Sequence, residues 1–296
     1  MSNTDQKDDF YVGYMPKAPK PVAKQARLFV VITALVIITT AAVLSLNQRD
    51  YNNSQFEYGQ LTTVEGWLYH EPVPIVKIYE GKDVNGKDRY KSIILINYLK
   101  FGAADLLKGY EEKIGSELPG MKVKLEGTLI YYDGVTLLEL TNQENALIEI
   151  INGEVPEIIN SITEFGEVTV QGEIVDPKCY FGSMKPGLGK PHRSCAIRCI
   201  SGGIPPMLAI SNDSGDLNYM LLVGENGEPI NMEVLNYVGD AVEITGRFQM
   251  YNEWYVLYAK PDQQIKRIAK AETEGQGNED GQVFHNASSS ITICGD

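Results

Sequence analysis

A run of 19 residues from Leu28 to Leu46, LFVVITALVIITTAAVLSL, contains no charged residue, no proline and no glycine. At a rise of about 1.5 Å per residue, a helix of this length matches the roughly 30 Å hydrocarbon core of a bilayer. Inside that core a lone segment satisfies its backbone hydrogen bonds only as a helix. A helix buried in a soluble core would normally carry a polar stripe, which this run lacks. The sequence therefore predicts a transmembrane helix over 28–46, with the bilayer as its partner.

The flanks of the apolar run indicate its orientation. Four basic residues closely precede it: Lys17, Lys20, Lys24 and Arg27. Arg49 follows it together with the acidic Asp50 and Glu57. Because cytoplasmic flanks are enriched in Lys and Arg, we expect a single-pass protein of the inner (cytoplasmic) membrane with a cytoplasmic N-terminus and a periplasmic bulk. A cleaved signal peptide is the alternative, although its charged lead and apolar region are usually shorter.

Composition narrows the class of protein. The formal net charge is −13 and the sequence pI is about 4.8, which argues against a nucleic-acid partner. Four cysteines are too few for a disulfide scaffold in a chain of 296 residues. The polar segments 1–27 and 269–296 are predicted to be disordered, the first on the cytoplasmic side and the second as a tail. The remaining region is long enough for two small domains.

Two stretches of the exported region resemble each other. TVEGWLY at 63–69 aligns with TVQGEIV at 169–175, an offset of 169 − 63 = 106 residues. VKLEG at 123–127 aligns with VEITG at 242–246, an offset of 242 − 123 = 119 residues. This internal repetition predicts two copies of one domain, over 58–152 and 160–268.

Each copy shows the same predicted order of elements, namely three strands, a helix and two strands. In the first copy we expect strands near 61–69, 75–79 and 89–96, a helix near 101–115, then strands near 121–132 and 135–140. In the second we expect strands near 166–175, 206–211 and 217–223, a helix near 230–237, then strands near 240–250 and 253–259. This order resembles that of the OB-fold, a five-stranded Greek-key barrel. The predicted fold is mainly β with short helices: an N-terminal transmembrane helix followed by two OB-fold-like small barrels.

The loop over 176–206 holds most of the residues that carry chemistry. The second offset exceeds the first by 13 residues, which places the extra length between the first and fourth strands of the second copy. In OB-folds the loop after the first strand borders the usual binding face. This loop contains Cys179, His192, Cys195 and Cys199. A short helical turn from Cys195 to Cys199 would place both thiols on one face.

A Cys-x3-Cys pair with a nearby histidine resembles the copper sites of Sco-type copper chaperones and of oxidase subunit II, in which the histidine lies downstream rather than upstream of the pair. The resemblance implies copper, and thiolate and imidazole also suit zinc. We therefore predict a metal site of Cys179, His192, Cys195 and Cys199. Two alternatives stay open: a disulfide of Cys179 with Cys195 or Cys199, and thiols with no role.

No catalytic residues are predicted, because the sequence shows no Ser/His/Asp set, no paired-acid motif and no nucleotide fingerprint. Apart from the metal, no cofactor is expected. In architecture, a membrane-anchored barrel resembles the haem chaperone of cytochrome c maturation, a family whose haem-attaching histidine lies near the end of its barrel. Here His285 lies in the tail and lacks a supporting motif, so haem attachment is not expected. We expect a non-enzymatic accessory or assembly protein, or a subunit, of a respiratory-type membrane complex, with a protein of that complex as partner. The alternatives are a thiol-redox or copper-transfer protein, and a binding module with a structural disulfide.

Overall fold

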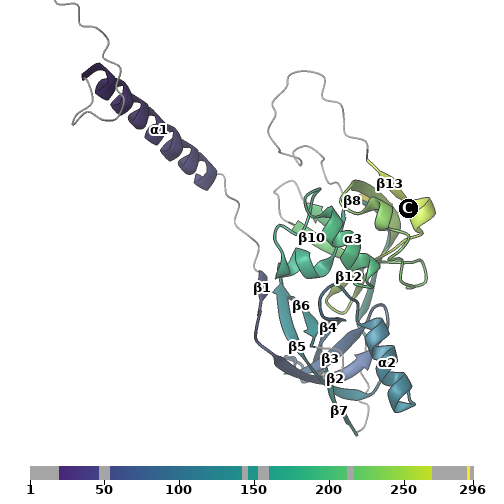
Figure 1. The fold of residues 1–296 in the computed structure, drawn as a ribbon. Coiled ribbons are helices and arrows are strands. Elements are labelled where there is room, and N and C mark those ends of the chain that lie inside the picture. The colour runs from purple at the N-terminus through teal and green to yellow at the C-terminus, as the bar shows by residue number, and fades with distance from the viewer. Residues whose placement is uncertain are drawn as a thin grey trace, which may run out of the picture. The chain divides into compact units, whose positions relative to one another are not determined.

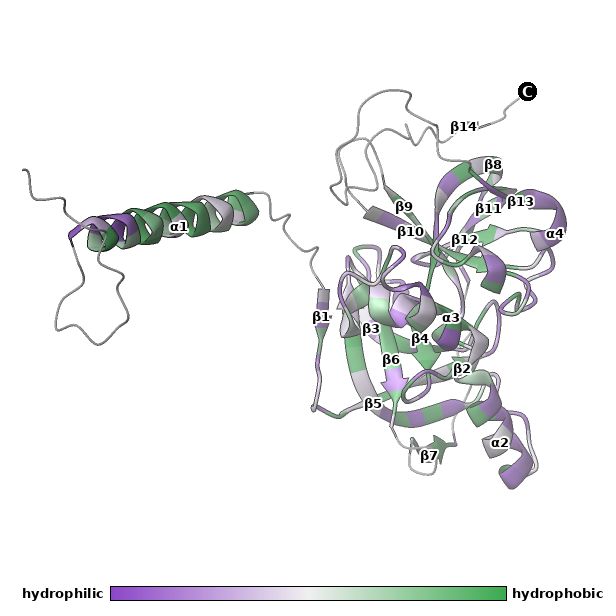
Figure 2. Ribbon diagram, turned by 45° about the horizontal axis from the view of Figure 1, so that its top comes forward, coloured by the Kyte–Doolittle hydropathy of each residue, from purple (hydrophilic) through white to green (hydrophobic). Residues whose placement is uncertain are grey.

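The computed structural model describes residues 20–46, 54–141, 146–152, 160–211, 217–268 and 292–293. The chain divides into two compact units, 1–51 and 52–296. The first contains helix α1 (Lys20–Leu46), which is long and apolar enough to cross a membrane and has no buried residue. Its apolar residues run along most of its length (Figure 2). The helix begins eight residues before the apolar run, so 20–27 are helical and differ from the predicted disordered segment. Residues 1–19 lie outside the described residues.

The first barrel consists of five strands and one helix. They are β2 (Thr62–Tyr69), β3 (Ile75–Lys82), β4 (Asp88–Ile96), α2 (Ala104–Ile114), β5 (Lys122–Tyr132) and β6 (Val135–Leu140) (Figure 1). The strands pair in the order β2-β3-β4-β6-β5, and β5 pairs with β2 to close the barrel. Strands β4 and β6 are parallel. Two short strands, β1 (Ser54–Phe56) and β7 (Leu147–Ile151), pair antiparallel with the two ends of β5.

The second barrel repeats this topology. Its strands are β8 (Ile162–Val175), β9 (Met207–Ser211), β10 (Leu217–Val223), β11 (Ala241–Tyr251) and β12 (Trp254–Tyr258). They pair in the order β8-β9-β10-β12-β11 and close through β11 and β8, with β10 and β12 parallel. Short elements flank them: η2 (Leu235–Tyr237), α4 (Pro261–Gln264), β13 (Ile265–Arg267) and β14 (Thr292–Ile293). The predicted mainly-β fold with two OB-like barrels is confirmed.

Two local predictions differ from the structure. The helix predicted near 230–237 is only the 3₁₀ turn η2. Ile230, Val234 and Val238 are buried, as on one face of a helix. The backbone hydrogen bonds there, however, include one α-type bond, from the N–H of Val234 to the carbonyl of Ile230, followed by an i→i+3 bond from the N–H of Tyr237 to the carbonyl of Val234. Within the tail predicted to be disordered, Thr292 and Ile293 form β14 against β8. The other tail residues from 269 onward lie outside the described part of the chain.

Paired glycines explain the sequence repeat on which the duplication was predicted. A Cβ atom on Gly66 of β2 would lie 2.3 Å from the carbonyl oxygen of Lys77, and one on Gly172 of β8 would lie 2.4 Å from that of Ala209. In the fourth strands, a Cβ atom on Gly127 would lie 2.3 Å from the carbonyl oxygen of Glu139, and one on Gly246 would lie 2.3 Å from that of Tyr258. The same close approach between neighbouring strands therefore occurs at equivalent places in both barrels, and only glycine fits there.

The two barrels share a hydrophobic core in addition to their own. One buried cluster combines residues of the first barrel, such as Ile94 and Tyr132, with Phe181 and Trp254 of the second. The rings of Tyr132 and Phe181 stack with centroids 4.8 Å apart and an interplanar angle of 3°. We call this shared cluster the seam. The indole of Trp254 also donates a hydrogen bond across it to the carbonyl of Ser92, at 2.9 Å. The seam thus holds the barrels together as one packed body.

A buried lysine adds a pH dependence to this body. Lys77 of β3 is 1% exposed, and its ammonium lies 5.1 Å from the ring centroid of Tyr69 and 5.2 Å from that of Tyr251. It donates a hydrogen bond to the side chain of Asn160. Burial lowers the pKa of Lys77 to about 8, against a smaller opposing effect of Glu253. The folded protein therefore releases this proton at a lower pH than the unfolded chain does.

We expect the Lys77→Met variant to lack the rise in unfolding free energy that the titration of Lys77 causes at alkaline pH. Between pH of about 8 and 10.5 the unfolded wild-type chain keeps a proton that the folded protein has lost, so the free energy of unfolding rises with pH by about 2 to 3 kcal/mol. Urea unfolding of both proteins at pH 7 and pH 10 measures this. A difference between wild type and variant that does not change with pH would contradict the assignment.

Candidate metal centre

The first thiol of the site lies immediately after the first strand of the second barrel. There Asp176 and Pro177 lead into η1 (Cys179–Ser183), a single π-helical turn. The Asp176 carboxylate accepts a hydrogen bond from the backbone N–H of Cys179 at 2.9 Å, which caps this turn. Phe181 of the same turn is anchored in the seam, so the Cys179 side chain is fixed and only 4% exposed.

The other two thiols come from helix α3 (Arg193–Ser201), which confirms the helical turn predicted over Cys195 to Cys199. His192 occupies its N-cap position and no side chain caps the helix. Ala196 and Ile200 pack into the second barrel's core, while Cys199 belongs to the shared core and is 1% exposed. Cys195, one turn earlier, is half-buried and packs against the shared core. Both views place α3 where the two barrels meet (Figures 1 and 2).

The three thiols converge on one point. The sulfurs of Cys179, Cys195 and Cys199 all lie within 4.8 Å of one another, and all three are free. Those of Cys179 and Cys195 are 4.0 Å apart. With Zn–S bonds of about 2.3 Å, a tetrahedral ion would hold its sulfurs about 3.8 Å apart. The 4.0 Å between the sulfurs of Cys179 and Cys195 is therefore close to the distance between two sulfurs bound to the same ion. It is about twice the length of a disulfide bond.

His192, the fourth predicted ligand, belongs to a second group of donors, which it forms with Asp176 and Cys179. Its ring is 6% exposed, and Nε2 lies 3.1 Å from Oδ2 of Asp176. Donor atoms of Asp176, Cys179 and His192 all lie within 4.8 Å of one another. The structure thus brings together the three predicted cysteines, and it joins His192 to one of them through Asp176.

The first barrel contributes a lysine to the thiol group. The ammonium of Lys100, in the loop between β4 and α2, lies 2.8 Å from Sγ of Cys195 and 3.8 Å from Sγ of Cys199. The hydrogen bond to Cys195 raises the pKa of Lys100 more than its partial burial lowers it. A cation therefore faces the thiols from across the seam.

Backbone contacts fix the loop that carries Lys100. The N–H of Gly102 donates to the carbonyl of Gly202 at 2.8 Å. A Cβ atom on Gly202 would lie 2.0 Å from the carbonyl oxygen of Lys100, so α3 and this loop approach more closely than any larger residue allows. Lys178 adds a buried ion pair with Glu139 of β6 and donates to the carbonyl of Leu99.

The buried thiol favours its neutral form when no ion is present. A hydrogen bond with Cys199 and burial together raise the pKa of Cys179 far above its ordinary value, and the hydroxyl of Ser183, 3.7 Å away, opposes them. Thiolate ligands form when a metal ion replaces the protons. An ion bound by these thiols would therefore displace protons as it binds.

Two residues of the site are absent from the sequence-based prediction. Asp176 carried a usable signal, because an Asp-Pro step just before a turn is typical of a capping position. Lys100 carried none, since its contact with Cys195 spans 95 residues and depends on how the barrels pack.

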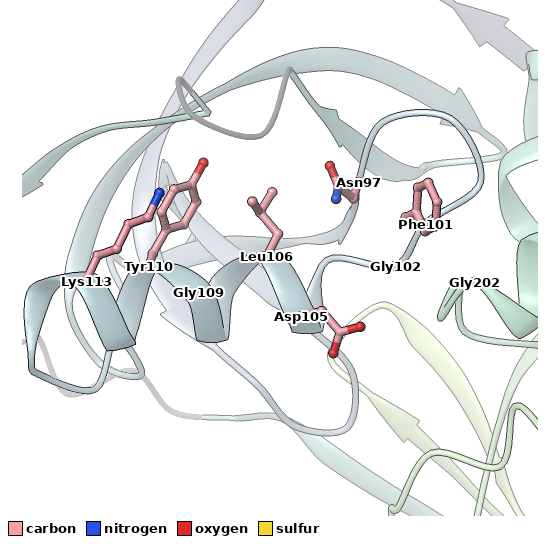
Figure 3. A pocket seen from close by; sticks show the side chains of 9 residues that line it. All are labelled: Asn97, Phe101, Gly102, Asp105, Leu106, Gly109, Tyr110, Lys113 and Gly202. Carbon is pink, nitrogen blue, oxygen red and sulfur yellow. The ribbon is translucent and has the colours of Figure 1, made fainter.

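A pocket of about 370 Å³ lies beside this loop (Figure 3). It is lined by α2, by the loop residues Asn97, Phe101 and Gly102, and by Gly202. Its charged side chains are Asp105 and Lys113, and neither a thiol nor an imidazole lines it. Neither group of converging metal-ligating side chains found among the described residues lines this pocket.

Comparison of the chain with protein families, with curated proteins and with solved structures returned no match.

Proposed function

We propose that this protein is a membrane-anchored, extracytoplasmic metal-binding protein that holds a copper or zinc ion through Cys179, Cys195 and Cys199. The observation that carries the proposal is the convergence of three free thiols within 4.8 Å where two barrels meet. Two of the thiols are almost fully buried, and a lysine of the other barrel faces the third. Three converging sulfurs without a disulfide favour a soft or borderline ion over a hard one.

The spacing favours a single ion at these thiols over an iron–sulfur cluster. A [2Fe–2S] centre places its protein ligands in two pairs, one on each iron, so the pairs stand apart by the width of the cluster. Here all three sulfurs lie within one short radius. Three thiolates at one ion match a trigonal Cu(I) or a tetrahedral zinc with one further ligand.

The anchor and the barrels support a non-enzymatic role beside a membrane complex. Helix α1 is long and apolar enough to span a bilayer, and its basic N-terminal flank favours a cytoplasmic N-terminus. The seam offers a rigid frame for the ion, while Cys195 remains half-exposed as a point of ligand exchange. We propose that the protein stores the ion for, or passes it to, a subunit of such a complex.

Metal and thiol content test this proposal. The full-length protein, extracted from its native membranes in detergent under anaerobic conditions, is expected to carry stoichiometric copper or zinc with Cys179, Cys195 and Cys199 protected from alkylation until a chelator is added. The Cys195→Ser variant is expected to lose the ion. Absence of metal together with a quantitative disulfide at Cys179 would refute the proposal.

A thiol-redox function is the second candidate, favoured by the 4.0 Å between the sulfurs of Cys179 and Cys195 and by Lys100 beside the more exposed of them. In this mechanism the Cys195 thiolate attacks a partner's disulfide and one partner thiol leaves. Cys179 then gives up its proton as its sulfur attacks Cys195 in the mixed disulfide, the second partner thiol leaves, and a Cys179–Cys195 disulfide forms while the partner is reduced. Incubation of the metal-free protein with oxidised glutathione, followed by peptide mass spectrometry, detects that disulfide. A persistent glutathione adduct at Cys195 would exclude Cys179 as the resolving thiol.

Replacing Lys100 tests the contribution of the first barrel to the ion site. We expect Lys100→Met to weaken ion binding about 10- to 100-fold, because loss of a group that hydrogen-bonds a ligand typically has an effect of this size. Lys100→Arg keeps a charged N–H donor and is expected to retain most of the affinity. Competition against a chromogenic chelator measures both. Equal affinity of wild type and Lys100→Met would show that Lys100 does not act on the site.

A further inference from the structure

We propose that the centre holds a second metal ion, bound by Asp176, His192 and Cys179, so that the Cys179 sulfur bridges two ions. This inference rests on the proposed function, because the first ion occupies the three thiols. Cys179 belongs to both groups of converging donors, one with Cys195 and Cys199 and the other with Asp176 and His192. A thiolate has lone pairs for two ions, and no other described residue is shared between the groups.

The second group has the spacing and the donor types of an ion site. Oδ2 of Asp176 and Nε2 of His192 are 3.1 Å apart. Bonds of about 2.0 to 2.2 Å to a tetrahedral ion would separate an oxygen and a nitrogen ligand by about 3.4 Å, so little movement is needed. One carboxylate, one imidazole and one thiolate form a borderline set that suits a divalent ion such as Zn²⁺.

The site is built into the fold rather than exposed on the surface. Asp176 is fully buried, and both Cys179 and His192 are less than a tenth exposed. The other carboxylate oxygen of Asp176 is held by the N–H of Cys179, which fixes the carboxylate beside the sulfur. His192 is fixed by its position at the start of α3. All three donors are therefore preorganised around one point.

A different arrangement would leave the protein with one ion. If the His192 ring turned toward the three thiols, it would complete the shell of the first ion, and Asp176 would only orient the ring, as carboxylates often do for histidine ligands. The two arrangements predict different numbers of ions per chain. They also differ in whether loss of His192 removes an ion or weakens the three-thiol site.

Cobalt titration of the metal-free full-length protein in detergent, kept anaerobic with reduced thiols, separates these cases. We expect two Co(II) ions per chain. The first gives strong sulfur-to-cobalt charge-transfer absorption, and the second lowers the electron paramagnetic resonance signal per cobalt through coupling across the Cys179 thiolate. Both His192→Gln and Asp176→Asn are expected to bind one ion, with the first absorption band retained. Asp176→Asn keeps an oxygen for the N–H of Cys179, so the turn is preserved.

Glu173→Gln is the matched control. Glu173 is a buried carboxylate near the end of β8, three residues before Asp176; it accepts a hydrogen bond from the N–H of Gly189, and it lies outside both donor groups. This variant is expected to bind two ions. A wild-type protein that binds one ion, or a second ion that survives His192→Gln, would overturn the bridged site and leave the three-thiol site intact. A protein that binds no cobalt and no copper would overturn the proposed function itself.

Discussion

Replacing Cys199 by serine is expected to remove the ion from the three-thiol site. Cys199 is 1% exposed and belongs to the shared hydrophobic core, so no water takes its place readily. A serine hydroxyl is a harder and far less acidic donor, and loss of a direct ligand should exceed the 10- to 100-fold effect typical of an outer-shell partner. We expect affinity for Cu(I) or Zn²⁺ to fall more than about 100-fold in chelator competition.

Cys294→Ser provides the matched control for this experiment. Cys294 is the fourth cysteine of the sequence and is not part of the proposed ligand set, so under this proposal we expect the same substitution there to leave ion binding unchanged. Circular dichroism should show the same β-rich spectrum for both variants. Retention of full affinity in Cys199→Ser would contradict the proposed ligand set.

Replacing Lys178 by methionine is expected to destabilise the pair of barrels strongly. The Lys178 ammonium forms an ion pair with Glu139 of the first barrel, and both side chains are 8% exposed. The variant leaves the Glu139 carboxylate buried without its partner, which typically costs about 3 to 5 kcal/mol. Urea unfolding of the full-length protein at pH 7 measures the loss of unfolding free energy.

The double variant Lys178→Met/Glu139→Gln separates loss of the pair from creation of an unpaired charge. Removing both charges is expected to recover at least half of the stability lost in the single variant, because the uncompensated carboxylate is then gone. If the double variant is as unstable as Lys178→Met alone, an unpaired Glu139 is not the cause.

Much of the fold could be predicted because its signals are local. Alternating apolar residues and turn residues located all ten barrel strands, and the Asp133-Gly134 turn has both residues at positive φ, as a type I′ hairpin turn requires. The repeated glycines at 66 and 172 indicated the duplication, since each permits the same close approach of strands. The helical spacing of Cys195 and Cys199 likewise placed both thiols in α3.

The arrangement of the site could not be predicted, because it depends on contacts between distant parts of the chain. Lys100 meets Cys195 only after the first barrel packs on the second. His192 was predicted as the partner of all three thiols, but its buried ring lies with Asp176 and Cys179. The sequence shows the types of donor atoms and which of them share a local turn. Packing between distant segments decides which donors face one another.

The most direct test of the metal centre is X-ray absorption of the ion that copurifies with the full-length protein, recorded at the edge of that ion. For protein that carries one ion per chain, as expected of the His192→Gln variant, our interpretation predicts about three sulfur neighbours near 2.3 Å, falling to two when Cys199→Ser is added and the ion is reloaded at high concentration. A shell of oxygen and nitrogen alone, or a sulfur count unaffected by Cys199→Ser, would contradict it.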